Sequence, residues 1–241
     1  MRKLWIPSPF YHPRGQYPLD MIVIHHIGSS NGKLYSTEGT ITWFTNEDVH
    51  KNPKTGEIEN KVSAHYIVPR KPYKESDVIH LVNHADIAYH AGYSQWLVEG
   101  KTRKYINNYS IGIELEGDGN LVEYTDYQYE VLIELVKNFV ESYKIPEANI
   151  VGHEDIAPDR KVDPGKLFDW KRLRSGINPP IIIIPAPSVV TSEVTPIVVA
   201  PPKTPDLPSN DSVPMGGGEN KVGKPKNLFS SFADFLKKLF R

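Results

Sequence analysis

The chain has 241 residues, of which 39% are apolar, and its formal net charge is −1 at pH 7. A near-neutral chain without a general basic footprint is not expected to bind nucleic acid, and the absence of cysteine excludes disulfide bonds and thiolate zinc ligands. Residues 1–7 lack the apolar stretch of a signal peptide or a membrane span, which predicts a cytoplasmic protein.

The first part of the chain predicts an arm, a buried strand, a short helix and a loop. Residues 5–19 are rich in Pro and Tyr and should form an extended arm on the domain. The apolar run from Met21 to Ile24 predicts a buried strand over 21–26. Ser36 then opens a short helix, and the polar residues 46–60 are expected to form an exposed loop on the rim of a cleft.

The middle of the chain predicts further strands and one long helix. Thr125 and Gln128 have the spacing of a capping box, and apolar residues recur at helical spacing after them, which predicts a helix over 126–143. This apolar stripe indicates core packing rather than a cofactor site. The predicted strands cover residues 62–68, 78–82, 110–116 and 150–151.

The segment 152–165 places charged and imidazole side chains where proline and glycine prevent a continuous helix. His153 and Asp163 can therefore fold back toward one ion, and zinc accepts both imidazole nitrogen and carboxylate oxygen. A catalytic zinc ion needs a third protein ligand. His25, at the end of the predicted buried strand, is the best candidate, and His26 is its rival.

Short blocks of sequence along the chain resemble one enzyme family. They are Ile24-His25-His26, Val62-Ser63-Ala64-His65, His90-Ala91-Gly92, the stretch from Ser110 to Gly117, and the stretch from Gly152 to Gly165. In this order they are similar to the zinc-dependent N-acetylmuramoyl-L-alanine amidases of the peptidoglycan-recognition and T7-lysozyme superfamily. The likeness is strongest to anhydro-muropeptide amidases of the AmpD type, and it covers roughly residues 5–175.

The resemblance implies a single mixed α/β domain, with a central sheet flanked by helices and a zinc cleft at one edge. It implies zinc held by His25, His153 and Asp163. The general acid/base of the family falls on Glu114, which would accept a proton from the zinc-bound water that attacks the lactyl carbonyl. Lys161 would stabilise the resulting oxyanion. Glu116, two residues beyond Glu114 and on the same strand face, is expected to be an orienting or structural group.

Three further residues are candidates for substrate binding. His65 and His90 match family positions near the substrate cleft, and Asn107 lies in the approach to the central strand. Each has a structural alternative. A histidine on a strand often has a structural role, and the alternative for His90 is that its imidazole locks the fold through a bond to the backbone instead of touching substrate.

The composition changes after residue 177. We expect an amidase domain over 1–177 and a disordered, extended Pro-rich linker over 178–226. Residues 227–241 have apolar positions on one helical face, which predicts a short amphipathic helix. Six basic residues and one acidic residue give the segment 221–241 a net charge of +5. Such a helix is typical of binding to an anionic membrane surface, and docking to a partner protein is the alternative.

The predicted substrate is peptidoglycan or its muropeptide fragments, cleaved between N-acetylmuramic acid and L-alanine. The linker and cationic helix favour lysis of the cell wall in the manner of an endolysin. The alternative is cytoplasmic recycling of anhydro-muropeptides. A peptidoglycan-binding module without activity is a third hypothesis, but such modules usually lack a full ligand set. A structural protein that tethers the envelope through its tail is a fourth.

Overall fold

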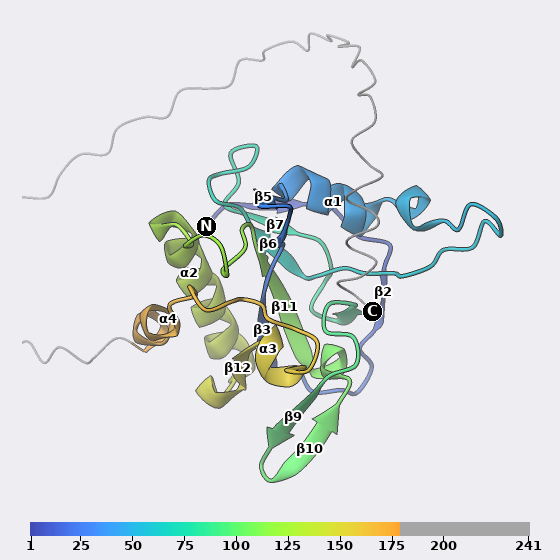
Figure 1. Ribbon diagram of the computed structural model, residues 1–241. Helices are drawn as coiled ribbons and strands as arrows, with labels where there is room; N and C mark the ends of the chain where they lie inside the picture. The colour runs from blue at the N-terminus through green and yellow to red at the C-terminus, as the bar shows by residue number, and fades with distance from the viewer. Residues whose placement is uncertain (179–241) are drawn as a thin grey trace, which may run out of the picture. The chain divides into compact units, whose positions relative to one another are not determined.

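The computed structural model describes residues 1–178 (Figure 1). The predicted helix over 227–241, and the predicted linker apart from Asn178, lie outside the described residues. The predictions of disorder and of membrane binding for these segments therefore stay predictions. Within the described residues, no helix is both long enough and apolar enough to span a bilayer.

A six-stranded sheet organises the described part of the chain, and its strand order is β1-β7-β6-β11-β3-β12. Strand β11 pairs in parallel with both β3 and β6, β12 pairs in parallel with β3, and β7 pairs antiparallel with β6. The sheet is therefore mixed, as predicted. The strands are β1 (Lys3–Trp5), β3 (Met21–His26), β6 (Tyr66–Val68), β7 (Val78–His80), β11 (Ser110–Leu115) and β12 (Ile150–Gly152).

Strand β3 is buried on both faces, because every one of its residues is covered. Ile22 and Ile24 belong to the apolar cluster that includes the long helix α2, whereas Met21 and Val23 belong to a different cluster. Alternation along a strand sends His25 to the face of Met21 and Val23. The two adjacent histidines at the strand end therefore lie in different environments.

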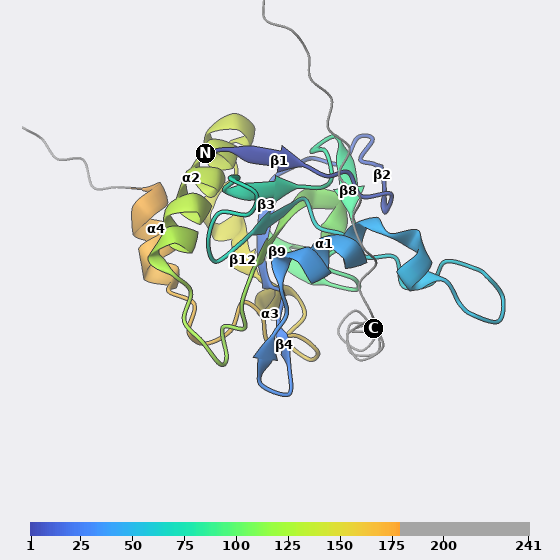
Figure 2. The ribbon, with the colours of Figure 1, turned by 90° about the horizontal axis from the view of Figure 1, so that it is seen from above.

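Helix α2 (Asp126–Tyr143) packs on one face of the sheet, and helix α4 (Trp170–Ile177) lies beside it (Figures 1 and 2). The Thr125 hydroxyl accepts a hydrogen bond from the backbone N–H of Gln128, and the Gln128 side chain accepts one from the N–H of Thr125, which completes the predicted capping box. The helix predicted over 126–143 is confirmed.

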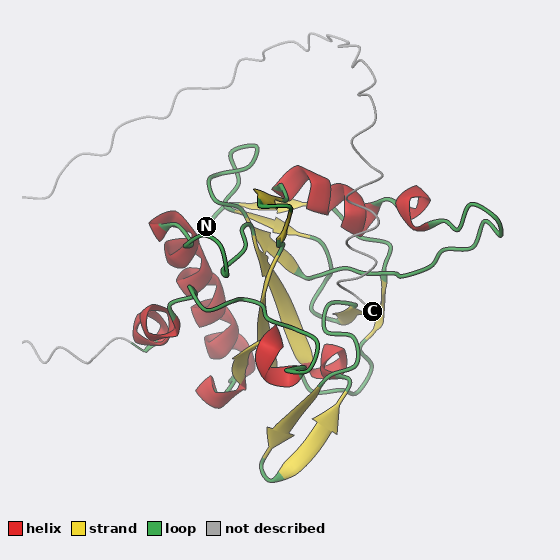
Figure 3. Cartoon of the chain, in the orientation of Figure 1, coloured by secondary structure: helices red, strands yellow, loops and turns green. Residues whose placement is uncertain are grey.

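Shorter elements surround the sheet (Figure 3). Helix α1 begins after the N-cap Ser36, whose side chain accepts from the N–H of Gly39. The remaining elements are β2 (Tyr11–Pro13), β4 (Ser29–Ser30), β5 (Lys33–Leu34), α1 (Thr37–Thr45), η1 (Glu47–His50), β8 (Asp86–Ala88), β9 (Gln95–Val98), β10 (Lys101–Lys104), η2 (Ile106–Tyr109), η3 (Glu147–Asn149) and α3 (His153–Ile156).

One predicted strand is shorter than expected, and one hairpin was not predicted. The strand expected over 62–68 is regular only from Tyr66, because Ser63 is bonded outside the ladder, to the backbone of Phe10 and Tyr89. The polar stretch after residue 94 forms the hairpin β9–β10, in which Glu99 and Gly100 both have positive φ. This pair of conformations suits a two-residue hairpin turn.

Candidate active site

The candidate site lies where the parallel strands β3, β11 and β12 reach their carboxyl ends, the edge at which open α/β sheets commonly bind ligands. His25 is near the end of β3, and its ladder partner on β11 is Glu114. Paired residues of neighbouring strands share a face of the sheet, so these two side chains lie on the same side. His153 follows β12 directly as the first residue of α3.

The loop after α3 brings Asp163 back to the same edge. The backbone N–H of Glu154 donates to the carbonyl oxygen of Asp163 at 2.8 Å, and the hydroxyl of Tyr124 donates to the carbonyl oxygen of Pro164 at 2.7 Å. Gly165 approaches the backbone of Gly119 closely, since a Cβ added to Gly165 would lie 2.6 Å from the carbonyl carbon of Gly119. The fold-back predicted for this segment is therefore held by named contacts.

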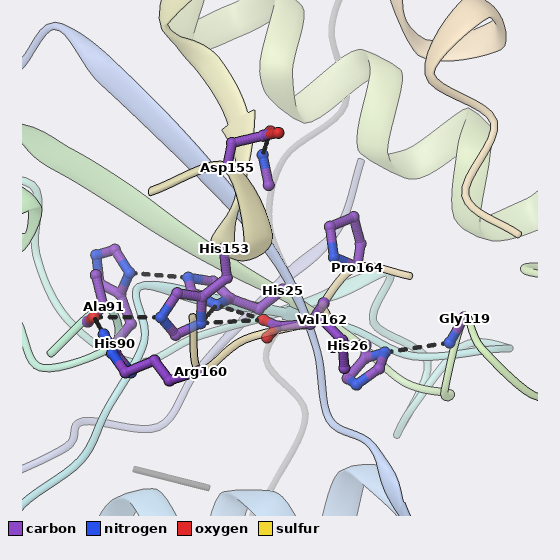
Figure 4. A network of polar contacts seen from close by, with 12 residues as sticks. His25, His26, His90, Ala91, Gly119, His153, Asp155, Arg160, Val162 and Pro164 are labelled. Carbon is purple, nitrogen blue, oxygen red and sulfur yellow. Dashed lines mark hydrogen bonds and ion pairs between the residues drawn. The ribbon is translucent and has the colours of Figure 1, made fainter. Parts of the chain in front are cut away.

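Three predicted ligand atoms meet in one place, and Figure 4 shows His25 and His153, the two histidines among them. The Nδ1 atoms of His25 and His153 are 2.9 Å apart, and the Asp163 Oδ2 atom is 3.0 Å from the first and 3.1 Å from the second. All three residues are buried. They are also the cluster of side chains within residues 1–178 whose donor atoms are placed to hold a metal ion.

Hydrogen bonds on the far side of each ring indicate which nitrogen carries the proton. His153 Nε2 is 3.2 Å from the carbonyl oxygen of Ala91, which only accepts, so Nε2 must donate and Nδ1 is the ring nitrogen left to bind a cation. His25 Nε2 is 2.9 Å from Nδ1 of His90. His90 Nε2 in turn faces the Ser110 hydroxyl at 3.2 Å, and that hydroxyl donates to the carbonyl oxygen of Ile106 at 2.7 Å.

The Ser110 hydroxyl has a single proton, and its bond to a carbonyl oxygen uses that proton. His90 must therefore donate through Nε2 and accept through Nδ1, and His25 donates through Nε2. Burial, followed by the neighbouring His153, lowers the pKa of His25 to about 4, so its ring is neutral. Two imidazole lone pairs and a carboxylate oxygen consequently face one another.

This arrangement suits a cation. Burial would raise the pKa of Asp163, but positive charge and hydrogen bonds from His153 and His25 hold it well below its usual range. A cation bound among the three side chains would supply the same positive charge while both rings stay neutral. A tetrahedral zinc ion with bonds of about 2.0–2.1 Å separates its ligand atoms by about 3.3 Å, and the three observed separations of 2.9–3.1 Å lie close to that value. The residues present therefore fit a metal ion with an open fourth position.

His26, the predicted rival, lies apart from these three atoms. Its Nδ1 accepts a hydrogen bond from the backbone N–H of Gly119 at 3.1 Å and is 3.8 Å from the carboxylate of Asp118. Its partner across the ladder is Leu115, a core residue on the α2 side. The geometry thus favours His25 over His26 as the third ligand.

Glu114 is only 2% exposed. Burial, reinforced by Asp163, raises its pKa well above the ordinary value, while Lys161 opposes the shift. Its carboxylate makes no hydrogen bond to another described side chain or backbone group. Burial also lowers the pKa of Lys161, and Asp163 opposes that shift. A buried carboxylate and a buried ammonium group therefore stand beside the three-ligand cluster, in positions that suit the roles predicted for them.

Glu116 has a different environment. Its carboxylate accepts hydrogen bonds from the hydroxyl of Thr37 at 3.0 Å and from the backbone N–H of Arg70 at 2.9 Å. Thr37 is the first residue of α1, so Glu116 ties the start of that helix to the central strand. These contacts agree with the structural role predicted for Glu116.

Of the three predicted substrate-binding residues, His65 and His90 are buried and Asn107 is half-buried. His65 is 0% exposed, and its Nδ1 accepts from the backbone N–H of Gly112 at 3.1 Å. His90 is 1% exposed and contacts His25. The Asn107 side-chain oxygen accepts from two backbone N–H groups, those of His90 and Ala91. Their role in substrate binding stays a prediction, and their contacts favour a structural role.

Comparison with known proteins finds amidases in each case. The model of the N-acetylmuramoyl-L-alanine amidase family matches residues 15–166. The chain is 37% identical over 172 residues to the 1,6-anhydro-N-acetylmuramyl-L-alanine amidase AmpD of Escherichia coli K12, a match covering 70% of this chain and 88% of the relative. It is also 40% identical over 126 residues to the N-acetylmuramoyl-L-alanine amidase AmiD of the same organism, which covers 48% and 44% of the two chains.

Solved structures show the same similarity. A crystal structure of a selenomethionine derivative of AmpD superposes with a TM-score of 0.60 at 34% identity, covering 73% of this chain and 94% of that one. AmiD from E. coli, in complex with the substrate anhydro-N-acetylmuramic acid-L-Ala-D-γ-Glu-L-Lys, superposes with a TM-score of 0.51 at 33% identity, covering 67% and 59%. The mixed sheet with flanking helices is therefore the fold of these amidases.

Proposed function

The chain belongs to the N-acetylmuramoyl-L-alanine amidase family and is an amidase, and on this premise we propose that it is a zinc enzyme acting on soluble anhydro-muropeptides. The bond cleaved is the amide between the lactyl group of N-acetylmuramic acid and L-alanine. The observation that carries the proposal is the meeting of His25, His153 and Asp163 beside the buried pair Glu114 and Lys161.

The preference for small fragments rests on the relatives. AmpD of E. coli is named for a 1,6-anhydro substrate, and the AmiD complex contains an anhydro-muropeptide. These similarities favour the recycling hypothesis over the lytic one drawn from the C-terminal sequence. Lysis stays as the second candidate, because the predicted Pro-rich linker and cationic helix favour it.

The proposed chemistry is addition of water to the lactyl carbonyl carbon, followed by cleavage of the C–N bond. A zinc ion held by His25, His153 and Asp163 would supply Lewis acidity at the carbonyl oxygen and lower the pKa of water. Glu114 accepts a proton from the attacking water and delivers it to the departing nitrogen of L-alanine. Burial supports this role, because a carboxyl with a raised pKa can hold that proton between the two steps.

Lys161 acts on the charge that develops at the carbonyl oxygen. Lys161 is 6% exposed, and its charge is felt by both Glu114 and Asp163. A cation fixed in a site shielded from water stabilises an oxyanion more than it would in solution. Once nitrogen is protonated, the C–N bond breaks and the peptide leaves with L-alanine at its amino end.

Metal removal should lower thermal stability. At zinc concentrations about 1,000 times the dissociation constant, binding to the folded state alone adds about 4 kcal/mol, which for a domain of this size raises Tm by roughly 10 °C. We expect this rise when zinc is added to the metal-free full-length protein in a calorimetric scan. The Asp163→Ala variant is the control and should show little rise. An equal rise in both proteins would place the bound zinc elsewhere.

The two candidate functions predict different substrate preferences. With one enzyme batch, we expect release of stem peptides from an anhydro-muropeptide to exceed release from intact sacculi on the order of 10-fold or more, compared as kcat/KM per cleavable bond. Chromatography of the released peptides measures both rates. Faster cleavage of sacculi would reverse the proposal and favour lysis.

A further inference from the structure

We propose that the dipeptide His90–Ala91, pinned by Asn107, is the positioning element for both histidine ligands of the candidate metal site. The His90 side chain orients His25, and the carbonyl oxygen of Ala91 orients His153. This inference rests on the proposed metal site, and it gives His90 and Asn107 a role other than binding substrate.

His90 acts on His25 through a chain of hydrogen bonds. The carbonyl oxygen of Ile106 fixes the Ser110 proton, Ser110 accepts from His90 Nε2, and His90 Nδ1 accepts from His25 Nε2 at 2.9 Å. With the Ser110 proton on the carbonyl oxygen of Ile106, the two following links run in one direction only. The chain therefore leaves Nδ1 of His25 as a lone pair that faces Asp163, which is the form of the ring that a cation binds.

Ala91 acts on His153 through its backbone. The carbonyl oxygen of Ala91 accepts from His153 Nε2 at 3.2 Å and also from the guanidinium of Arg160. Because a carbonyl oxygen never donates, the proton of His153 must lie on Nε2, and Nδ1 is left for the cation. His90 has the same effect on His25. Metal-bound histidines commonly donate their other N–H to such a partner, which fixes the ring and its tautomer.

Asn107 and Gly112 fix the dipeptide itself. The Asn107 side-chain oxygen accepts from the N–H of His90 at 3.1 Å and from the N–H of Ala91 at 2.7 Å. Gly112 leaves the space that the His90 ring fills, because a Cβ on Gly112 would lie 2.4 Å from Cγ of His90. The His90 ring, in a residue that is 1% exposed, is thus held against His25 of β3 and against Ser110 and Gly112 of β11, with no surface left for a substrate.

The first test measures zinc affinity of full-length variants by competition with a chelator of known affinity. His90→Leu removes the acceptor for His25 and should weaken zinc binding about 10–100-fold, the usual effect of losing such a partner. His90→Asn places an amide oxygen near the position of Nδ1 and should restore most of that affinity. His84→Leu is the matched control, because His84 is a partly buried histidine bonded to Tyr66 and Tyr143 rather than to a ligand.

The outcomes separate the alternatives. Equal affinity in His90→Leu and the wild-type chain would overturn the proposal, and so would equal losses in His90→Leu and His90→Asn, since that pattern indicates packing alone. A wild-type chain that binds no zinc would instead refute the proposed metal site.

A second measurement needs no substitution. Long-range ¹H–¹⁵N NMR spectra of the zinc-loaded wild-type protein should show His90, His25 and His153 protonated at Nε2 only. Protonation of His90 at Nδ1 would overturn the proposal.

Discussion

Replacing His25 with alanine should remove the metal and reduce anhydro-muropeptide hydrolysis by roughly 10³-fold, because a Lewis acid contributes several kcal/mol of transition-state stabilisation. The geometric reason is that the His25 Nδ1 atom is one corner of the triangle completed by His153 and Asp163. Without it, two ligands remain, which is one fewer than a catalytic zinc site uses. Zinc per chain, measured by atomic emission after dialysis, and kcat/KM check the two parts of this prediction.

His26→Ala is the matched control, since His26 is the neighbouring histidine of the same strand. Its Nδ1 accepts from the N–H of Gly119, so its loss should lower Tm while zinc content stays near one per chain. The opposite pattern, with zinc lost from His26→Ala and retained in His25→Ala, would mean that the assigned ligand is wrong by one residue.

Glu114→Gln should leave zinc in place and reduce kcat on the order of 10²–10⁴-fold, the range that general acid/base catalysis contributes. Glutamine nearly keeps the volume of the side chain but accepts no proton. The 2% exposure of Glu114 makes replacement by a proton-accepting water unfavourable. Steady-state kinetics with an anhydro-muropeptide, together with zinc content, measures the effect.

Glu116→Gln provides the comparison for Glu114→Gln. The Glu116 carboxylate accepts hydrogen bonds from Thr37 at the start of α1 and from the backbone N–H of Arg70 just after β6, so its substitution should lower Tm with a much smaller effect on kcat. If Glu116→Gln were the inactive variant and Glu114→Gln near normal, the roles of the two carboxylates would be exchanged.

The sequence predicted those parts of the fold whose causes are local. Apolar spacing and the Thr125–Gln128 capping box are contained within one helix, and α2 has the predicted bounds. The placement of His25 also followed from a local pattern, an apolar run that ends in a polar residue. Helix α4 was not predicted, although Trp170, Leu173 and Ile177 have helical spacing and the last two are buried.

Other features depend on contacts between distant segments. No local pattern shows that the carbonyl oxygen of Ala91 meets His153, or that His90 lies between His25 and Ser110. The family resemblance marked His90 as a site residue without indicating which atoms it touches. Only the fold shows that its ring faces a ligand. The loop predicted to be exposed over 46–60 likewise contains a buried residue, His50, because other segments of the chain pack against it.

The central claim is that a zinc site formed by His25, His153 and Asp163 drives cleavage of the bond before L-alanine. Mass spectrometry of the products formed from an anhydro-muropeptide, by metal-free and by zinc-restored full-length protein, tests this claim most directly. We predict anhydro-N-acetylmuramic acid and an intact peptide beginning with L-alanine, formed only after zinc is restored. Equal hydrolysis by the metal-free protein, or cleavage at a different bond, would contradict the account.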